Sequence, residues 1–236
     1  MDEQQKKVAK EFDEYHRSYS DKVNDSVSFT GLDVDYFTAV KAAYILDNVN
    51  EILGSQEQIS CLDIGCGVGN FHRLLFSKIG SLTGIDVSEQ CINTARMNNP
   101  GVDYDVYDGV KLPYQDNSFD LVFAVCVLHH VPTHAWSSFV CEMSRVLKSG
   151  GVAMIFEHNP LNPLTKYVVN NCPFDENAVL LRGSKTVSLF QEAGFKMIDL
   201  RYVLSVPAKT SFSRRIDRLF SKLPFGAQYY VSSVKP

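Results

Sequence analysis

The sequence has no long hydrophobic run, and this absence limits where the protein can work. Its longest apolar stretch, residues 121–128, is far shorter than the roughly 20 residues that a membrane-spanning helix needs. The first ten residues, MDEQQKKVAK, are charged and lack the apolar centre of a secretory signal. We therefore expect a cytoplasmic protein without a membrane-spanning segment.

Paired cysteines are also lacking. Six cysteines are scattered along the chain without a Cys-x-x-Cys pair, which is typical of a reducing compartment and not of a disulfide scaffold. No group of cysteines and histidines has the spacing of zinc ligands. His129 and His130 are adjacent, but we expect that two side chains at the end of one strand cannot reach a single ion without strain. The sequence predicts no metal site.

An excess of positive charge is absent as well. The chain has 27 acidic and 23 basic residues and a formal net charge of −4, which excludes a generally basic nucleic-acid-binding protein. Its 236 residues and its 45% hydrophobic content fit a soluble globular protein. We expect a single domain over residues 1–236.

From residue 59 onwards, short apolar segments alternate with segments of helical periodicity. Strands are expected at 59–64, 81–85, 102–106, 119–127, 152–156, 195–204 and 228–234. Helices are expected at 36–53, 70–78, 88–99, 132–149 and 184–193. This alternation predicts an α/β fold with a seven-stranded, mostly parallel sheet and helices on both faces.

Two segments fall outside this alternation. Residues 1–35 mix aromatic and charged side chains and are expected to form a lid segment, with Tyr15, His16 and Tyr19 either over a ligand or packed in the core. Residues 157–183 contain three prolines and are too long for a plain connection. We expect this second segment to be an insertion that shapes a substrate pocket.

The most informative stretch is residues 61–70, CLDIGCGVGN. A glycine-rich turn between a strand and a helix lets the backbone approach a ligand closely. A dinucleotide site would need G-x-G-x-x-G, whereas Gly65, Gly67 and Gly69 have the spacing G-x-G-x-G. The negative charge of Asp63 would also be unfavourable beside a pyrophosphate, whereas it suits a cationic amino-acid ligand.

Two further acids follow the next two strands. Asp86 ends the second strand, where a carboxylate can accept two hydrogen bonds from ribose hydroxyls; the alternative is a cap for the helix near Ser88. Asp108 follows the third strand, and alone it would be an ordinary turn residue. With Asp63, these acids mark one edge of the sheet, where open α/β sheets bind ligands.

At this point the chain resembles the class I S-adenosylmethionine-dependent methyltransferases. The motifs LDIGCGVG, GIDVS, YDGVKLPY, FDLVFAVCVLHHV and SRVLKSGG occur in the family's order between about residues 59 and 157. Gly109 and Ser149 replace the usual Ala and Pro. The resemblance implies a Rossmann-like fold and S-adenosyl-L-methionine as cofactor.

The resemblance also implies a role for individual residues. Asp63, Gly65 and Gly67 would meet the methionine part, Asp86 the ribose, Val87 the face of the adenine, and Asp108 and Gly109 its polar edge. Val125 or Cys126 would line the pocket below the sulfonium.

Two histidines are candidates for a general base, which oxygen acceptors need more than amines do. His158 follows the fifth strand and begins the insertion; its alternative role is a cap for the next helix. His130 is the second candidate, although in many family members this histidine is structural or touches the cofactor. His72 is expected at the surface.

Residues 209–223 combine five basic side chains with apolar residues on one helical face. Such a helix can lie on an anionic membrane. The alternative is a helix docked on its own domain with a solvated basic rim.

The sequence thus predicts methyl transfer to a small organic acceptor, with oxygen or nitrogen favoured over carbon. The alternatives are a lipid-linked or quinone-like acceptor reached through the basic helix, and a cofactor-binding protein without transferase activity. The sequence indicates neither the acceptor nor the oligomeric state.

Overall fold

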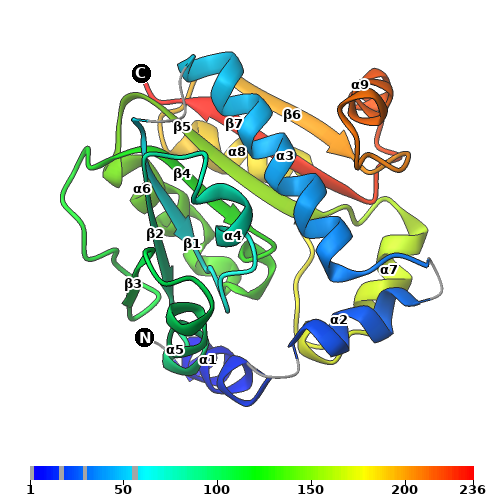
Figure 1. Ribbon diagram of the computed structural model, residues 1–236, viewed down its shortest axis with the longest axis horizontal. Coiled ribbons are helices and arrows are strands. Elements are labelled where there is room, and N and C mark those ends of the chain that lie inside the picture. The colour runs from blue at the N-terminus through cyan, green and yellow to red at the C-terminus, as the bar shows by residue number, and fades with distance from the viewer. Residues whose placement is uncertain (1–2, 16–18, 29–30, 55–57) are drawn as a thin grey trace.

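A computed structural model describes residues 3–15, 19–28, 31–54 and 58–236, and it contains one seven-stranded sheet (Figure 1). The strands are β1 (Ser60–Ile64), β2 (Ser81–Asp86), β3 (Asp103–Val106), β4 (Phe119–Val125), β5 (Leu147–His158), β6 (Ile198–Val203) and β7 (Gln228–Val234). They lie in the order β3-β2-β1-β4-β5-β7-β6. Strand β7 pairs antiparallel with both β5 and β6, and all the other pairs of neighbouring strands are parallel. The predicted Rossmann-like, mostly parallel sheet is confirmed.

Helices cover both faces of the sheet (Figure 1). The α-helices of the described residues are α1 (Glu3–Tyr15), α2 (Tyr19–Val27), α3 (Val34–Leu53), α4 (His72–Leu75), α5 (Glu89–Asn98), α6 (Trp136–Val146), α7 (Pro163–Asn170), α8 (Gly183–Glu192) and α9 (Ser211–Phe220). Helices α3, α4 and α5 share one hydrophobic cluster with the sheet, and α6 and α8 share the other. None of these helices is long and apolar enough to cross a membrane.

The two clusters arise from the alternation of side chains along each strand. In β4, Leu121 and Phe123 pack with α3, whereas Val122 and Ala124 face α6, and all four are fully buried. A parallel strand covered on both faces reads as one continuous apolar run. This burial explains why the central strands could be predicted from the sequence.

Two predicted helix boundaries are wrong. The helix expected at 70–78 has only four residues, α4. Gly150 and Gly151 were expected to close a helix, but they lie within β5, which begins at Leu147. A side chain at Gly151 would lie 2.9 Å from the carbonyl oxygen of Asp120, so this glycine allows close strand contact where the β4–β5 register shifts.

The two outlying segments lie near the carboxyl ends of the parallel strands (Figure 1). Helix α1 is held against α5, because Asp13 accepts hydrogen bonds from the Ser88 hydroxyl and from the Gln90 amide. Helix α7, from the 157–183 segment, is tied to the residue just before β7 by the 2.7 Å hydrogen bond from Thr165 Oγ1 to the Ala227 carbonyl. Both segments therefore border the ligand edge of the sheet.

Candidate active site

A cavity of about 460 Å³ lies at the carboxyl ends of β1, β2, β4 and β5. Its walls come from the glycine loop and Asp86 on one side, and from His129, His130 and His158 on the other. Apolar side chains of α1, α2, α3 and α7 complete the lining. One space therefore contains the predicted cofactor end and both candidate bases.

The glycine loop has the backbone conformation that glycine favours. Gly65 and Gly67 have φ angles of +74° and +53°. A Cβ at Gly65 would lie 2.5 Å from Val127, whereas the space beside Gly67 is open. The amide of Gly65 donates to the Ile85 carbonyl, and that of Gly67 donates to Asp86. A ligand can therefore approach the bare backbone of this loop closely.

Asp86 is buried beside the loop and lines the cavity. Its carboxylate accepts hydrogen bonds from the amides of Gly67 (2.8 Å) and Ser88 (2.9 Å). Burial raises the pKa of this carboxyl, while those hydrogen bonds oppose the shift. Each oxygen keeps acceptor capacity for a further hydroxyl. The cap of α5 is Ser88, whose hydroxyl accepts from the Cys91 amide.

Asp63 and His72 form a buried pair, so the expectation of a surface position for His72 is wrong. His72 is fully buried, and its Nε2 lies 3.1 Å from Asp63 Oδ2, while its Nδ1 bonds the Tyr104 hydroxyl. A Cβ at Gly84 would lie 2.7 Å from the imidazole, so the missing side chain of Gly84 makes room for the ring. His72 thus orients Asp63, which lines the cavity.

The remaining predicted cofactor residues divide into two groups. The first group lines the cavity: Val87, Gly109, Val125 and Cys126. Asp108 is not part of this lining; its exposed carboxylate accepts from the amides of Val110 (2.9 Å) and Lys111 (3.2 Å). These hydrogen bonds lower its pKa. The carboxylate of Asp108 thus stabilises its own turn.

Cys126 follows β4 at the centre of the cavity wall, with a φ angle of +57°. Its Sγ lies 3.8 Å from Lys41 Nζ and 3.7 Å from Gln228 Nε2. Burial alone would raise the pKa of the thiol, but the positive charges of Lys41 and His158 lower it to about 7. The left-handed backbone of a non-glycine residue at this point is typical of strain at functional sites.

His158 ends β5 and also lines the cavity. Its Nδ1 lies 3.4 Å from Gln228 Nε2, and its ring centroid lies 5.2 Å from that of His129. Burial lowers the pKa of the imidazole, but the neighbouring Cys126 outweighs this effect and raises it. The alternative role as a helix cap is wrong, because Asn162 caps α7.

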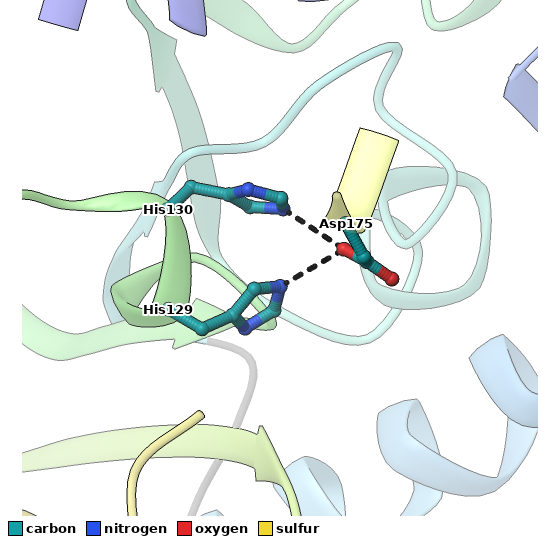
Figure 2. Close-up of side chains that lie close together, drawn as sticks. All are labelled: His129, His130 and Asp175. Atoms are coloured by element: carbon teal, nitrogen blue, oxygen red, sulfur yellow. Dashed lines mark ion pairs between the residues drawn. The ribbon is translucent and has the colours of Figure 1, made fainter. Parts of the chain in front are cut away.

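His129 and His130 point toward the same carboxylate oxygen (Figure 2). The Nε2 atoms of both rings lie 3.4 Å from Asp175 Oδ1. The other nitrogen of His129, Nδ1, lies 2.5 Å from Glu157 Oε2. The expectation that adjacent histidines cannot converge is wrong, because they lie in a 3₁₀ turn, residues 128–130, and not on a strand.

Sequence reasoning missed three polar residues of the cavity lining: Lys41, Asp175 and Gln228. Nothing near Asp175 in the sequence indicated its position. His16 lies outside the described residues, as do the side chains of Tyr15 and Tyr19.

The cavity also contains polar atoms without partners. Among the described residues, the buried side-chain atoms that lack a hydrogen bond are Ser205 Oγ and Gln228 Oε1. Both residues line the cavity. Buried polar atoms are normally bonded, so these two atoms are available to a ligand.

Comparison with known proteins identifies a methyltransferase domain in the central part of the chain. Residues 62–155 match the family model of a methyltransferase domain. The methyltransferase GfsG of Streptomyces halstedii is 31% identical over 150 residues, a match that covers 59% of this chain and 53% of that protein. Demethylmenaquinone methyltransferase of Staphylococcus aureus is 35% identical over 123 residues, which covers 48% of this chain and 49% of the relative. The chain thus spans about half the length of these curated relatives.

Solved structures share the fold over a larger part of the chain. A Thermotoga maritima S-adenosylmethionine-dependent methyltransferase, described as a possible histamine N-methyltransferase, has a TM-score of 0.69 at 20% identity, covering 97% of this chain and all of that chain. Phosphoethanolamine N-methyltransferase 2 of Haemonchus contortus, solved with S-adenosyl-L-methionine, has a TM-score of 0.58 at 21% identity. That match covers 81% of this chain and 52% of that chain.

Proposed function

We propose that this chain, a member of the class I S-adenosylmethionine-dependent methyltransferase family, methylates an oxygen or nitrogen atom of a small, largely apolar organic acceptor. The observation that carries the proposal is the single cavity between Asp86 and His158. Its volume of about 460 Å³ lies in the range typical of small-molecule sites.

The residues at one end of the cavity fit S-adenosyl-L-methionine. The bare backbone of Gly65 and Gly67 suits the methionine part, Asp63 its ammonium group, and Asp86 the ribose hydroxyls. Val87 suits the face of the adenine. When bound, this cofactor supplies an activated methyl group, so the protein has only to align the acceptor and exclude water.

At the other end, we assign the role of general base to His158. Its imidazole lines the cavity beside Cys126, and a neutral imidazole nitrogen there can accept a proton from a hydroxyl group. Gln228 contacts the same ring and carries the unpaired Oε1, which could accept a hydrogen bond from the acceptor. The alternative base, His130, is turned toward Asp175.

The rest of the lining selects for apolar molecules. Phe12, Val27 and Phe37 from the N-terminal helices and Leu164 and Val168 from α7 also line the cavity, and the ring centroid of Phe12 lies 5.1 Å from that of His130. Apolar walls with a few polar groups orient a ligand through those groups. We therefore expect an acceptor with one hydroxyl or amine on a mainly hydrophobic frame.

The test combines cofactor binding with methyl transfer. Calorimetry should detect S-adenosyl-L-methionine, and methyl-labelled cofactor should label an acceptor in a panel of phenols, quinols and amines. His158→Ala should keep cofactor affinity within about twofold and lower transfer about 10²–10⁴-fold, while the exposed His134→Ala should change neither. Binding without transfer to any acceptor would favour a cofactor-binding protein, and near-normal turnover of His158→Ala would reject the base.

A lipid-linked or quinone-like acceptor is the second candidate, and helix α9 favours it. Apolar side chains on and just after this helix are exposed: Phe212 (72%), Leu219 (79%), Phe220 (41%), Leu223 (45%) and Phe225 (64%). The polar side of α9 faces the protein instead. An exposed apolar patch of this kind is typical of a contact with a membrane or partner.

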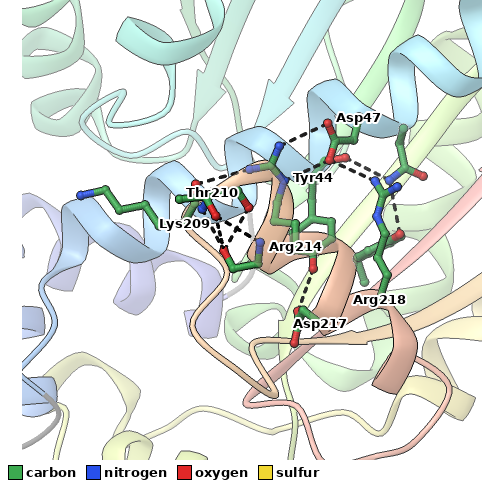
Figure 3. A network of polar contacts seen from close by, with 10 residues as sticks. Tyr44, Asp47, Lys209, Thr210, Arg214, Asp217 and Arg218 are labelled. Carbon is green, nitrogen blue, oxygen red and sulfur yellow. Dashed lines mark hydrogen bonds and ion pairs between the residues drawn. The ribbon is translucent and has the colours of Figure 1, made fainter.

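Figure 3 shows how the polar side of α9 is docked on α3. Arg214 and Arg218 each lie 3.0 Å from Asp47 Oδ2. The buried Asp217 accepts from the Tyr44 hydroxyl at 2.7 Å and from the amides of residues 204–206. We infer that α9 is held rigidly with its apolar side outward, and that this side rests on an anionic membrane.

A further inference from the structure

We propose that His129, His130 and Asp175 form a binding site for a divalent first-row transition-metal ion, which would hold a polar group of the acceptor in the cavity. The role toward the acceptor rests on the proposed methyl transfer, whereas the binding of the metal does not. The first observation is the convergence of three donor atoms on one point (Figure 2).

The separations between the donors suit one ion. One ligand atom from each residue lies within 4.8 Å of the other two, and each histidine Nε2 is 3.4 Å from Asp175 Oδ1. Ligands about 2.0–2.2 Å from a metal ion lie about 3.0–3.6 Å apart in octahedral or tetrahedral sites. Two of the three donor–donor separations therefore already match those between ligands of one metal ion, without any movement of the side chains.

The types of donor indicate the type of metal. Two imidazole nitrogens and one carboxylate oxygen suit manganese, iron, cobalt or zinc, whereas magnesium and calcium prefer sites made only of oxygen. Two histidines and one carboxylate on one side of an ion leave the other positions open. All three residues line the cavity, so the open positions would face the acceptor.

A second carboxylate supports the ligand His129. Glu157 is fully buried in β5; its Oε2 lies 2.5 Å from His129 Nδ1, and its Oε1 accepts from the Leu128 amide at 2.7 Å. A carboxylate that accepts from Nδ1 leaves the lone pair on Nε2, the atom that faces Asp175, and orients the ring. This arrangement recurs at histidine ligands of metal sites.

The backbone holds the two halves of the site together. Asp175 ends the 3₁₀ turn Pro173–Asp175 in the 157–183 segment. The amide of Val179 donates to the carbonyl of His129 at 2.9 Å, so the segment is tied to the histidine turn. The side chains of His129, His130 and Asp175 are only 1%, 14% and 10% exposed. The site is therefore built before an ion binds.

Without a metal, the same contacts would be an ion cluster in which protonated His129 bridges Glu157 and Asp175. The two descriptions differ at His130. In the ion cluster His130 is dispensable, whereas in the metal site it supplies a ligand. The substitution His130→Ala therefore separates them.

The experiment titrates Co²⁺ into the purified full chain and follows visible absorption and calorimetry. We expect one Co²⁺ per chain, with an absorption band typical of nitrogen and oxygen ligands. Asp175→Asn and His130→Ala should each weaken Co²⁺ affinity at least about tenfold, and Glu157→Gln about 10–100-fold. The exposed His134→Ala is the control for adventitious binding and should leave the affinity unchanged.

Affinity for S-adenosyl-L-methionine, measured on the same samples, reports whether each variant is folded. Loss of Co²⁺ binding with cofactor affinity intact supports the metal site. Failure of the wild-type chain to bind Co²⁺, or equal binding by wild type and by a folded His130→Ala or Asp175→Asn, would overturn it. Absence of cofactor binding in a chain that still binds Co²⁺ would instead contradict the proposed methyl transfer.

Discussion

Asp86 ends β2 and Asp108 follows the neighbouring strand β3, yet the two carboxylates have different environments in the structure. Asp86 is buried at the cavity wall, whereas Asp108 is exposed and bonded to its own turn. A carboxylate contributes most to binding where water is excluded, because the surrounding dielectric is low there. At the scale of single residues, Asp86 should therefore contribute more to cofactor affinity than Asp108.

The substitution Asp86→Ala tests this expectation. Loss of a carboxylate that accepts hydrogen bonds from ribose hydroxyls should cost about 2–3 kcal/mol, or roughly thirty- to a hundredfold in affinity for S-adenosyl-L-methionine and its demethylated product. Calorimetry is the measurement, and the exposed Asp103→Ala on β3 is the matched control. Unchanged affinity in Asp86→Ala, or tight binding of a dinucleotide, would contradict the assignment.

At the scale of elements, the loop after β3 is held by side chains of α6. Arg145 donates to the carbonyls of Leu112 (2.9 Å) and Tyr114 (2.7 Å), and it pairs with Glu142, which accepts from the Leu112 amide. The hydrogen bonds from Arg145 lower the pKa of Glu142. Helix α6 thereby fixes the loop that carries Gly109 into the cavity wall.

This contact predicts a dependence of stability on pH. A carboxyl whose pKa is lower in the folded state than its unfolded value of about 4.3 adds stability above that pH, and the gain disappears as the pH falls through the folded pKa. Glu142→Gln should lower the free energy of unfolding by about 1–2 kcal/mol at pH 7. The difference from wild type should shrink below about pH 4.

Urea unfolding at several pH values measures this difference. The exposed Glu51→Gln on α3 is the control, because Glu51 lies in solvent and its charge acts on Arg201 without a hydrogen bond like that between Glu142 and Arg145. A difference between wild type and Glu142→Gln that persists unchanged at pH 3 would show that Glu142 acts through packing alone.

At the scale of the whole molecule, the cavity is assembled from segments far apart in the chain. Residues of α1 to α3, of the loops after β1, β2, β4 and β5, of α7 and of the region before α9 all contribute to the lining. Helix α9 lies at the periphery, beside β6 (Figure 1). A membrane contact at α9 would bring the whole chain, with its net negative charge, close to the membrane surface.

Vesicle co-sedimentation tests the membrane contact. Binding should rise with the content of anionic lipid and fall with added salt, because salt screens the exposed Lys209 and Arg215. The double substitution Phe212→Ser and Leu219→Ser removes two apolar contacts worth about 1.5–3 kcal/mol each and should weaken binding by about two to four orders of magnitude.

Met97, exposed by 75% on α5, offers the matched control Met97→Ser, which should bind as wild type does. Equal recovery of wild type in the supernatant with neutral and anionic vesicles would leave α9 with a structural role only.

The sequence by itself determined the sheet, the order of the strands along the chain and the glycine loop that lines the cavity. These features depend on local signals, because burial on both faces makes strands apolar, and a glycine loop between Asp63 and Asp86 has a recognisable spacing. The start of the helix expected at 88–99 could be predicted for the same reason, since its cap Ser88 depends on one residue and its immediate neighbours.

Only the tertiary structure decided the acceptor end. At the glycine-loop end, too, His72 of α4 became buried only because Gly84 of β2 leaves space for it. His129 and His130 met Asp175 because the 157–183 segment folds back over the turn. The apolar side of α9 became exposed because Asp217 pairs with Tyr44, 173 residues earlier. Contacts between residues so far apart leave no periodicity or spacing in a single sequence, because their geometry exists only after the chain has folded.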